Sequence, residues 1–261
     1  MQLDRALVTG ASAGIGRAIA TELASRGTDL VLVARDEARL KDLADTLSGR
    51  HGVDVEVLPA DLTLPDDRAR VEQRIADRPV VDCVVNNAGW GPYGNLAGSD
   101  AATEADCVEL NVTALTRLSQ VAAQTFNVRR HGAILNVSSL SAFQPFPGHA
   151  TYAATKAFVN SLTESLHEEL LGTGVHVTAL CPGYTRTEFH ERADWDTGGV
   201  PAAAWGRAED VARAAVDGVL ANRAIVIPGT ANRVLGNLSR VLPSGVSRKV
   251  TKQLASRGDR H

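Results

Sequence analysis

Four polar residues have the types and spacing of a group that exchanges a proton with a substrate oxygen. Tyr152 and Lys156 stand four positions apart, so on a helix they share one face. Ser139 follows the apolar run 134–137, and Asn111 lies inside a long helical pattern. A free tyrosine has a pKa of about 10, and a neighbouring ammonium favours its phenolate form. The set predicts Tyr152 as a general acid/base, assisted by a cation, a hydroxyl and an amide.

Each of these residues also fits an ordinary structural role when it is taken alone. Tyr152 fits a half-buried helix position and Lys156 a surface charge, while Ser139 fits a strand-end cap and Asn111 a helix kink. Their occurrence together in one chain favours the catalytic interpretation.

A glycine-rich turn supplies the candidate cofactor site. Residues 9–16 read TGASAGIG and lie between the first apolar run and the first helical pattern. The glycines permit a tight turn and close approach of a pyrophosphate, which the helix N-terminus then attracts. The spacing G-x-x-x-G-x-G differs from the general dinucleotide fingerprint, and an ordinary strand-to-helix turn is the structural alternative. The cofactor-binding residues predicted in this turn are Gly10, Ser12, Gly14, Ile15 and Gly16.

The residues after the second apolar run discriminate between the two nicotinamide cofactors. An acid there would bond the ribose 2′-hydroxyl of NAD(H) and repel a 2′-phosphate. Arg35 instead offers a guanidinium suited to bidentate phosphate contact, and Asp36 can point away. Ala13 leaves a second basic position empty, and a solvated loop charge is the alternative for Arg35. We predict NADP(H) as the cofactor, with NAD(H) less favoured.

Seven short apolar runs alternate with longer helical patterns. The runs cover residues 6–8, 30–33, 53–57, 80–85, 134–137, 175–179 and 225–227. The helical patterns repeat about every four residues, as at Ile15, Ile19 and Leu23. This alternation predicts an α/β fold, a doubly wound Rossmann-type three-layer sandwich with a seven-stranded parallel sheet. We expect residues 1–230 to form one catalytic and cofactor-binding domain, with residues 231–261 as its C-terminal helical extension.

Composition and charge exclude several classes of protein. The 261 residues are 44% hydrophobic and 22% charged, as in ordinary globular proteins. Asp4 and Arg5 argue against a signal peptide, and the longest stretch without charged residues is too polar to span a membrane. Three scattered cysteines suit neither a disulfide framework nor a metal site, which indicates a cytoplasmic protein without a bound metal. Residues 1–232 are acidic, which argues against nucleic-acid binding.

Taken together, the motifs resemble the short-chain dehydrogenase/reductase family in its compact single-domain subtype. A single Y-x-x-x-K is common by chance, whereas seven matches in the family's order are not. The matching pieces are residues 9–16, Asp61-Leu62, Asn86-Asn87-Ala88-Gly89, Asn111, Ser139, Tyr152-x-x-x-Lys156 and Pro182-Gly183 followed by Thr187. The glycine spacing and the Tyr-to-Lys spacing match neither the epimerase and dehydratase branches nor the enoyl reductases.

The resemblance implies roles for residues in the cofactor site. Asp61 and Leu62 would contact adenine, and Asn87 would touch the adenosine side. Thr187 would approach the nicotinamide carboxamide and the phosphates, and Lys156 would hold the nicotinamide ribose.

The resemblance and the chemistry together imply roles in catalysis. Ser139 would hydrogen-bond the substrate oxygen, and Asn111 would hold a water that links Lys156 to solvent. We expect an oxidoreductase that transfers a hydride between NADP(H) and a carbonyl or alcohol, with Tyr152 as acid/base. A regulatory or scaffold protein that binds NADP(H) without turnover is the alternative.

The few aromatic residues gather in segments that such a fold brings to the catalytic crevice. Concentrated aromatics beside a small polar set are typical of ligand pockets, although loop anchoring also explains them. Because the same segments hold few cations, we expect an apolar ketone, aldehyde or alcohol as substrate. The aromatics in question are Trp90, Tyr93, Phe143, Phe146, Tyr152, Tyr184, Phe189, Trp195 and Trp205.

The C-terminal extension reads as two short amphipathic helices. Residues 233–261 hold seven basic residues and one acid. Docking on the body or on a second subunit is the favoured interpretation, and contact with a membrane surface is the less favoured one. The two apolar faces are Val234, Leu235, Leu238, Val241 and Leu242, then Val246, Val250 and Leu254.

Two long helices predict a homodimer, since the family commonly assembles through its fourth and fifth helices. In this chain they would cover residues 104–130 and 151–172. The second carries an apolar stripe of small and large residues that a twofold pairing would bury. The stripe consists of Ala153, Ala154, Ala157, Phe158, Leu162 and Leu166.

Overall fold

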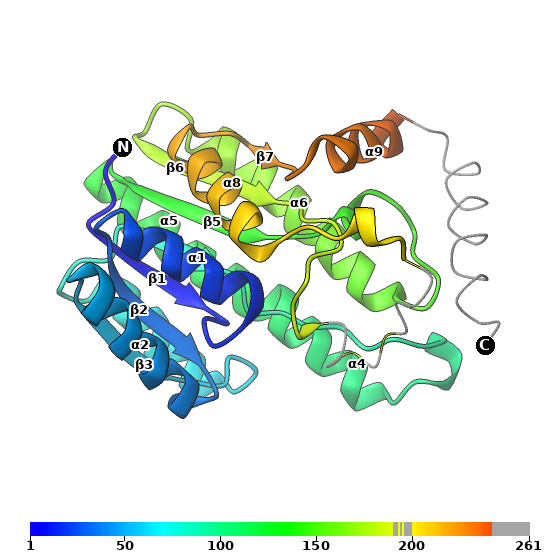
Figure 1. Cartoon of the computed structure of the whole chain (residues 1–261), viewed down its shortest axis with the longest axis horizontal. Coiled ribbons are helices and arrows are strands. Elements are labelled where there is room, and N and C mark those ends of the chain that lie inside the picture. Colours follow the sequence, from blue (N-terminus) through cyan, green and yellow to red (C-terminus); the bar gives the residue numbers. More distant parts are fainter. Residues whose placement is uncertain (190–192, 194, 196–199, 242–261) are drawn as a thin grey trace.

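The fold is built on a seven-stranded, wholly parallel sheet with the order β3-β2-β1-β4-β5-β6-β7 (Figure 1). The computed structural model describes residues 1–189, 193, 195 and 200–241. The chain winds outward from β1 to β3, then returns to β4 beside β1 and winds the other way. The strands are β1 (Arg5–Thr9), β2 (Asp29–Ala34), β3 (Val55–Pro59), β4 (Cys83–Asn86), β5 (Gly132–Val137), β6 (Val175–Leu180) and β7 (Ile225–Val226).

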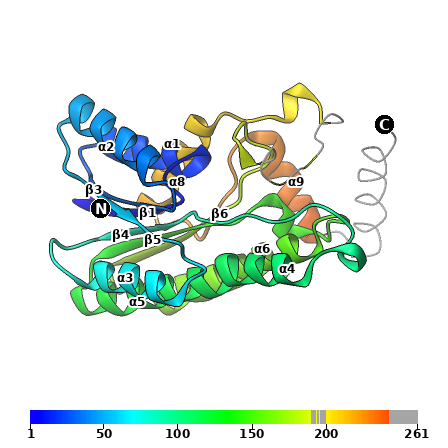
Figure 2. The same ribbon diagram turned by 90° about the horizontal axis from the view of Figure 1, so that it is seen from below.

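Helices cover both faces of this sheet, as Figure 2 shows edge-on. One face carries α1 (Gly14–Ser25), α2 (Glu37–His51) and α8 (Ala208–Leu220), and the other carries α3 (Pro65–Ala76), α5 (Leu115–Arg129) and α6 (Ala150–Glu169). Apolar residues of each helix layer form a separate core with one face of the strands. The predicted doubly wound α/β sandwich with a seven-stranded parallel sheet is therefore confirmed.

The long helix predicted over residues 104–130 is present but interrupted. It consists of α4 (Ala101–Val108), a π-helical segment (Glu109–Ala114) and α5. The π-helical segment contains Asn111, whose side chain is fully buried. The second long helix, predicted over 151–172, is α6 and ends at Glu169.

Helix α3 is an element that the apolar pattern did not reveal. It buries only Val71, Arg74 and Ile75, so its sequence lacks a clear apolar stripe. It begins with Pro65 at its first turn, a position that favours proline.

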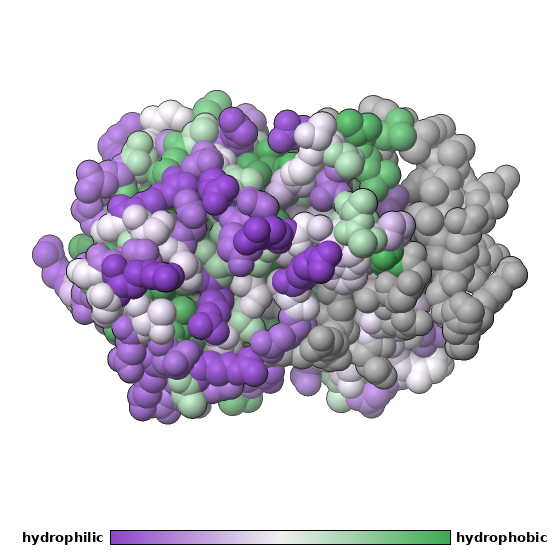
Figure 3. Space-filling model, in the orientation of Figure 1, coloured by the Kyte–Doolittle hydropathy of each residue, from purple (hydrophilic) through white to green (hydrophobic). Residues whose placement is uncertain are grey.

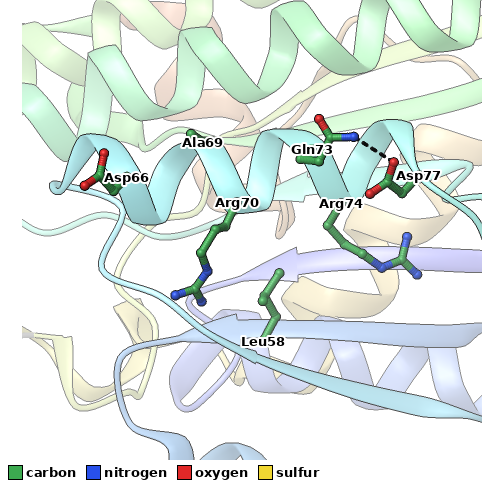
Figure 4. A pocket seen from close by; sticks show the side chains of 7 residues that line it. All are labelled: Leu58, Asp66, Ala69, Arg70, Gln73, Arg74 and Asp77. Carbon is green, nitrogen blue, oxygen red and sulfur yellow. Dashed lines mark hydrogen bonds between the residues drawn. The ribbon is translucent and has the colours of Figure 1, made fainter.

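Helix α3 also protects the exposed edge of the sheet. Arg74 Nε donates to both carboxylate oxygens of Glu56 on the edge strand β3, at 2.9 Å each, and Arg70 donates to the Pro59 carbonyl. Figure 4 shows Arg70 and Arg74 extending from α3 towards Leu58 of β3, around a hollow that these residues line. Charged side chains over an edge strand discourage pairing with other chains.

The C-terminal extension begins with α9 (Thr230–Val241), as its apolar periodicity predicted. Gly236 packs against Ile227, Leu140 and Phe143, so this helix lies at the carboxyl end of the sheet. Its opposite side exposes apolar groups, and Figure 3 shows hydrophobic surface over this helix. The exposed fractions are 63% for Val234, 50% for Leu235 and 49% for Leu238. The second amphipathic helix predicted for the extension, over residues 246–254, lies outside the described residues.

No helix within the described ranges combines the length and the apolar character that crossing a bilayer requires.

Candidate active site

The glycine-rich turn between β1 and α1 has the conformation that its sequence predicts. Gly10 and Gly14 have φ angles of +64° and +55°, which disfavour residues with side chains. A Cβ atom at Gly16 would lie 2.3 Å from the Gly10 carbonyl oxygen, so only glycine fits there. Ser12 lies in the turn and Ile15 in the first turn of α1, both half-buried. The glycines therefore leave room for a pyrophosphate to approach the backbone of the turn closely.

Asn87 braces this turn from the neighbouring strand. Its Nδ2 donates to the carbonyl oxygens of Thr9 at 2.9 Å and Gly10 at 3.2 Å. The Thr9 hydroxyl in return accepts from the backbone N–H groups of Asn87 and Ala88, at 3.0 Å each. These hydrogen bonds of Asn87 are with the turn itself, which gives this residue a structural role beside the adenosine contact implied by the resemblance.

The end of β2 leaves a guanidinium open to a ligand. The Arg35 side chain is 77% exposed, and its Nη1 lies 3.8 Å from Asp61 Oδ2. Asp36 is the N-cap of α2 and accepts from the Arg39 backbone N–H at 3.0 Å, so its carboxylate is turned into the helix as predicted. An anion bound at the end of β2 would therefore face the Arg35 guanidinium and not the Asp36 carboxylate.

Asp61 and Leu62 lie beside the end of β2, at the end of β3. Asp61 Oδ1 accepts from both the backbone N–H and the hydroxyl of Thr63, at 3.0 and 2.7 Å. Leu62 is 5% exposed and packs in the core beneath β1 and β2, while Arg68 donates to its carbonyl oxygen at 3.1 Å. These contacts order the loop that the resemblance assigns to adenine.

The proposed acid/base pair is buried on one face of α6. Tyr152 is 8% exposed and Lys156 is 4% exposed. A hydrogen bond joins the side chains of Tyr152 and Ser139, and Lys156 Nζ lies 5.6 Å from the centre of the Tyr152 ring. Lys156 Nζ also donates to the Val137 carbonyl oxygen at 2.9 Å. The structure therefore brings the three residues together at the carboxyl end of β5.

Burial controls the protonation of this pair. It raises the pKa of Tyr152 well above its usual value, although the hydrogen bond from Ser139 acts in the opposite direction. Burial also lowers the pKa of Lys156 to about 8. The expected lowering of the tyrosine pKa is not found in the protein alone, because loss of hydration on burial is the largest effect on Tyr152. Tyr152 is consequently held in its protonated form, which donates a proton.

Two glycines that the sequence analysis left without a role touch this pair. A Cβ atom at Gly91 would lie 2.6 Å from Tyr152 Cβ, and one at Gly89 would lie 3.2 Å from Lys156 Nζ. The backbone after β4 thus packs directly on the side chains of Tyr152 and Lys156. Gly89 ends the motif Asn86-Asn87-Ala88-Gly89, whereas the only signal for Gly91 in the sequence was its position soon after the strand.

Asn111 fastens the same backbone stretch. Its Oδ1 accepts from the Trp90 N–H at 3.1 Å, while its Nδ2 donates to the Trp90 carbonyl oxygen at 2.8 Å and to Thr155 Oγ1 at 3.0 Å. Asn111 therefore links α6 to the loop after β4. The side-chain amide is engaged by protein groups, so any role in holding a water would fall to the carbonyls of its π-helical segment.

Thr187 lies over the glycine-rich turn from the opposite side. A Cβ atom at Gly14 would be 3.2 Å from Thr187 Cβ, so the loop after β6 approaches the N-terminus of α1. The glycine-rich turn, the exposed Arg35 guanidinium and the Tyr152–Lys156 pair all follow the carboxyl ends of neighbouring strands or face them. This donor set fits a nicotinamide dinucleotide, since it offers backbone amides, a cation and a proton donor in sequence.

Aromatic rings gather above Tyr152, as the sequence analysis predicted. Tyr152 contacts Phe189 with ring centres 5.6 Å apart and His149 at 5.8 Å. The ring centre of Trp195 lies 4.3 Å from that of His149, and Trp195 contacts three further rings. The rings joined in this cluster are Tyr93, Phe146, His149, Tyr152, Tyr184, Phe189, Trp195 and Trp205.

His149 is a member of the cluster that the sequence analysis missed. It is 2% exposed and precedes α6, three residues before Tyr152. A single histidine in a loop carries no signal of its own in a sequence. Of the other two predicted aromatics, Phe143 packs against Gly236 and Trp90 is held by Asn111.

Comparisons with known proteins agree with this geometry. The family model described as short chain dehydrogenase matches residues 4–197. Sulfoacetaldehyde reductase 2 of Chromohalobacter salexigens is 38% identical over 192 residues, which are 71% of this chain and 74% of that protein.

Two solved structures extend the likeness to nearly the whole chain. A short-chain dehydrogenase from Sphingobium yanoikuyae in complex with NADPH is 38% identical with a TM-score of 0.84, covering 97% of this chain and 95% of that one. The bulky-bulky ketone specific alcohol dehydrogenase from Comamonas testosteroni is 32% identical with a TM-score of 0.79, covering 100% of this chain and 96% of that one. The chain therefore belongs to the short-chain dehydrogenase/reductase family and is an oxidoreductase that acts on alcohol or carbonyl groups with a nicotinamide cofactor.

Proposed function

We propose that this enzyme transfers a hydride between NADP(H) and the carbonyl or alcohol group of a small apolar molecule, with Tyr152 as general acid/base. The observation that carries the proposal is the buried Tyr152 hydroxyl, which is hydrogen-bonded to Ser139 and close to Lys156 beneath the aromatic cluster. A protonated hydroxyl at this point suits the reduction of a carbonyl group.

The chain's own residues then divide the work of the reaction. NADPH, when bound, supplies the hydride that the carbonyl carbon receives. Tyr152 gives its hydroxyl proton to the carbonyl oxygen, which becomes the alcohol hydroxyl, and the phenolate left behind is stabilised by the Lys156 ammonium. Ser139 holds the same oxygen while negative charge develops on it. In the direction of oxidation, the phenolate takes the alcohol proton.

Arg35 supports NADP(H) over NAD(H). Its guanidinium is exposed at the end of β2, whereas the Asp36 carboxylate is turned into the α2 N-terminus. A 2′-phosphate would gain charge-assisted hydrogen bonds there. The NADPH bound to the related Sphingobium enzyme supports the same choice.

The aromatic cluster supports an apolar substrate. Phe189 and His149 flank Tyr152, and the rings around Trp195 extend the apolar wall. The related Comamonas enzyme is described as specific for bulky-bulky ketones, which fits a wall of this kind. We place the substrate among apolar ketones, aldehydes and the corresponding alcohols.

The remaining features of the molecule fit a single-domain cytoplasmic enzyme. Cys83, Cys107 and Cys181 all lie among the described residues, are buried and form no disulfide bond with one another, as expected in a reducing compartment. Helix α9 packs on the carboxyl end of the sheet, which supports residues 231–261 as an extension of the domain formed by residues 1–230.

The test is turnover of NADPH and NADH with a panel of apolar ketones and aldehydes, using the wild type and Tyr152→Phe. We expect higher kcat/KM with NADPH, and a loss of about 10²-fold or more in Tyr152→Phe because the proton donor is removed. NADPH affinity should stay almost unchanged, since the hydroxyl contributes little to holding the nucleotide. Retention of more than about a tenth of the rate would refute the acid/base role, and NADPH binding without turnover of any compound would favour the regulatory alternative.

A further inference from the structure

An ion pair joins the start of α2 to the loop after β6. Arg39 lies in the first turn of α2, after β2, and Glu188 lies in the loop after β6. Arg39 Nη1 donates to both carboxylate oxygens of Glu188, at 3.1 and 2.9 Å. Strands β2 and β6 lie on opposite sides of the β1–β4 boundary, where the winding of the sheet reverses. Ligands of doubly wound sheets bind at this boundary, so the pair spans the site.

The α2 side of this contact is held rigidly. The Asp36 side chain caps α2 through the Arg39 N–H, and Asp36 Oδ2 lies 3.4 Å from Arg39 Nε. The guanidinium therefore sits between the Asp36 and Glu188 carboxylates, with its orientation restrained by the helix start.

The loop that carries Glu188 is held at two further points. Arg186 N donates to the Gly206 carbonyl oxygen at 3.0 Å, and Gly206 N donates to the Tyr184 carbonyl oxygen at 2.8 Å, which fastens the loop beside α8. Thr187 then lies over Gly14 of the glycine-rich turn. The ion pair between Glu188 and Arg39 joins the same loop to α2. The loop is therefore held by contacts on both sides of the glycine-rich turn.

We propose that Arg39 and Glu188 form a latch, which holds residues 184–188 of the loop after β6 over the nucleotide and slows nucleotide release. This inference rests on the proposed function, because a dinucleotide with its pyrophosphate at the α1 N-terminus would lie beneath the loop. Both residues act by positioning the loop.

The Arg39–Glu188 ion pair is weak enough to break and re-form in each turnover. The two side chains are 47% and 45% exposed, and ion pairs of such exposure are weak and screened by salt. Breaking the pair should therefore speed nucleotide release by about two- to fivefold, with no collapse of binding. A weak latch would let product nucleotide leave in each turnover.

The experiment measures release rates of NADPH and NADH by stopped-flow fluorescence, with Glu188→Gln compared with the wild type. The control is Glu72→Gln, which removes another glutamate–arginine pair with two hydrogen bonds, from Arg117 Nε and Nη2 at 2.9 and 2.8 Å, between α3 and α5. We expect release of both nucleotides to accelerate about two- to fivefold in Glu188→Gln and to stay unchanged in the control.

A double-mutant cycle separates the latch from other effects. Arg39→Gln should match Glu188→Gln, and the double variant should release the nucleotides no faster than either single variant. The latch would be overturned by unchanged release rates, or by effects of the two substitutions that multiply in the double variant. A change for NADPH alone would also overturn it and would show that Arg39 acts on the 2′-phosphate. A wild type that binds neither nucleotide would refute the proposed function itself, and the latch with it.

Discussion

At the residue scale, the position of Tyr152 depends on a backbone that leaves no room beside it. Gly91 faces its Cβ, and Gly89 faces Lys156 and Asn111. Asn111 in turn binds both backbone groups of Trp90, between these two glycines. Tyr152, the proposed acid/base, is thus positioned by the backbone after β4 as well as by its own helix.

Replacing Gly91 by alanine tests this dependence. The new Cβ would meet Tyr152 Cβ and Cδ2 at 2.6 Å each, so the ring must move. Because a displacement of about 1 Å can cost on the order of 10²-fold in rate, we expect a large loss of kcat with little change in NADPH affinity. Gly98→Ala serves as the control, since nothing lies within 4 Å of a Cβ there. A kcat near that of the wild type would show that Tyr152 is not held by this contact.

The pH dependence of reduction should follow Lys156. Burial lowers its pKa to about 8, while burial keeps the pKa of Tyr152 above its usual value. Both groups are therefore protonated below about pH 8 in the free enzyme, the state that reduction uses. We expect kcat/KM for a ketone to be level at lower pH and to fall as the pH rises through about 8 and the ammonium is lost. A profile that remains level well above that pH would contradict this role of Lys156.

At the element scale, α3 is held to the sheet edge by arginines in addition to Val71 and Ile75, the two apolar side chains that it buries. Arg74 is 9% exposed and bridges the edge strand, with Glu56 on one side and the Pro79 carbonyl at 3.0 Å on the other. A buried guanidinium that satisfies both an acid and a carbonyl group fixes the helix against the sheet edge.

Arg74→Met should therefore destabilise the protein while preserving the aliphatic packing. The change leaves the Pro79 carbonyl without this donor and Glu56 without its cation, so the free energy of unfolding should fall by about 1–3 kcal/mol. Urea denaturation measures this value. Arg213→Met is the control, because its pair with Asp210 is 61% and 64% exposed and the expected change is within about 0.5 kcal/mol. Equal effects of the two substitutions would count against the bridging role of Arg74.

At the scale of the whole molecule, α6 presents an exposed stripe that suits pairing with a second copy. Ala154, Ala157, Phe158 and Ser161 are exposed along this helix. Two residues of the predicted stripe turn inward instead, since Ala153 is 6% exposed and Leu166 packs on the core. Small exposed residues around Phe158 would allow close approach of two helices.

We therefore predict a homodimer that Ala157→Arg converts to a monomer. A charged side chain of that length in the centre of a twofold interface would meet its own copy and repel it. Light scattering gives the mass, and Ala69→Arg, on an exposed position of α3, is the control. A monomeric wild type, or a dimer that persists in Ala157→Arg, would exclude this interface.

Local patterns in the sequence were sufficient to predict much of this protein. Strand and helix periods predicted the sheet, the glycine-rich turn predicted the cofactor end, and the spacing of Tyr152 and Lys156 predicted their shared face. These features follow from backbone geometry over a few residues, so neighbours in the chain suffice to encode them. Helix α3 was not predicted, because it buries too few apolar side chains to show a helical period.

Only the tertiary structure decided the contacts between distant parts of the chain and the charges within them. Arg39 and Glu188 are 149 positions apart, and no local pattern joins them. The approach of Gly91 to Tyr152 and the place of His149 among the aromatic rings likewise depend on how separate loops meet. The pKa values of Tyr152 and Lys156 depend on burial, which is a property of the packed molecule. The sequence therefore determined which groups are available for the chemistry, whereas packing determined their positions and protonation states.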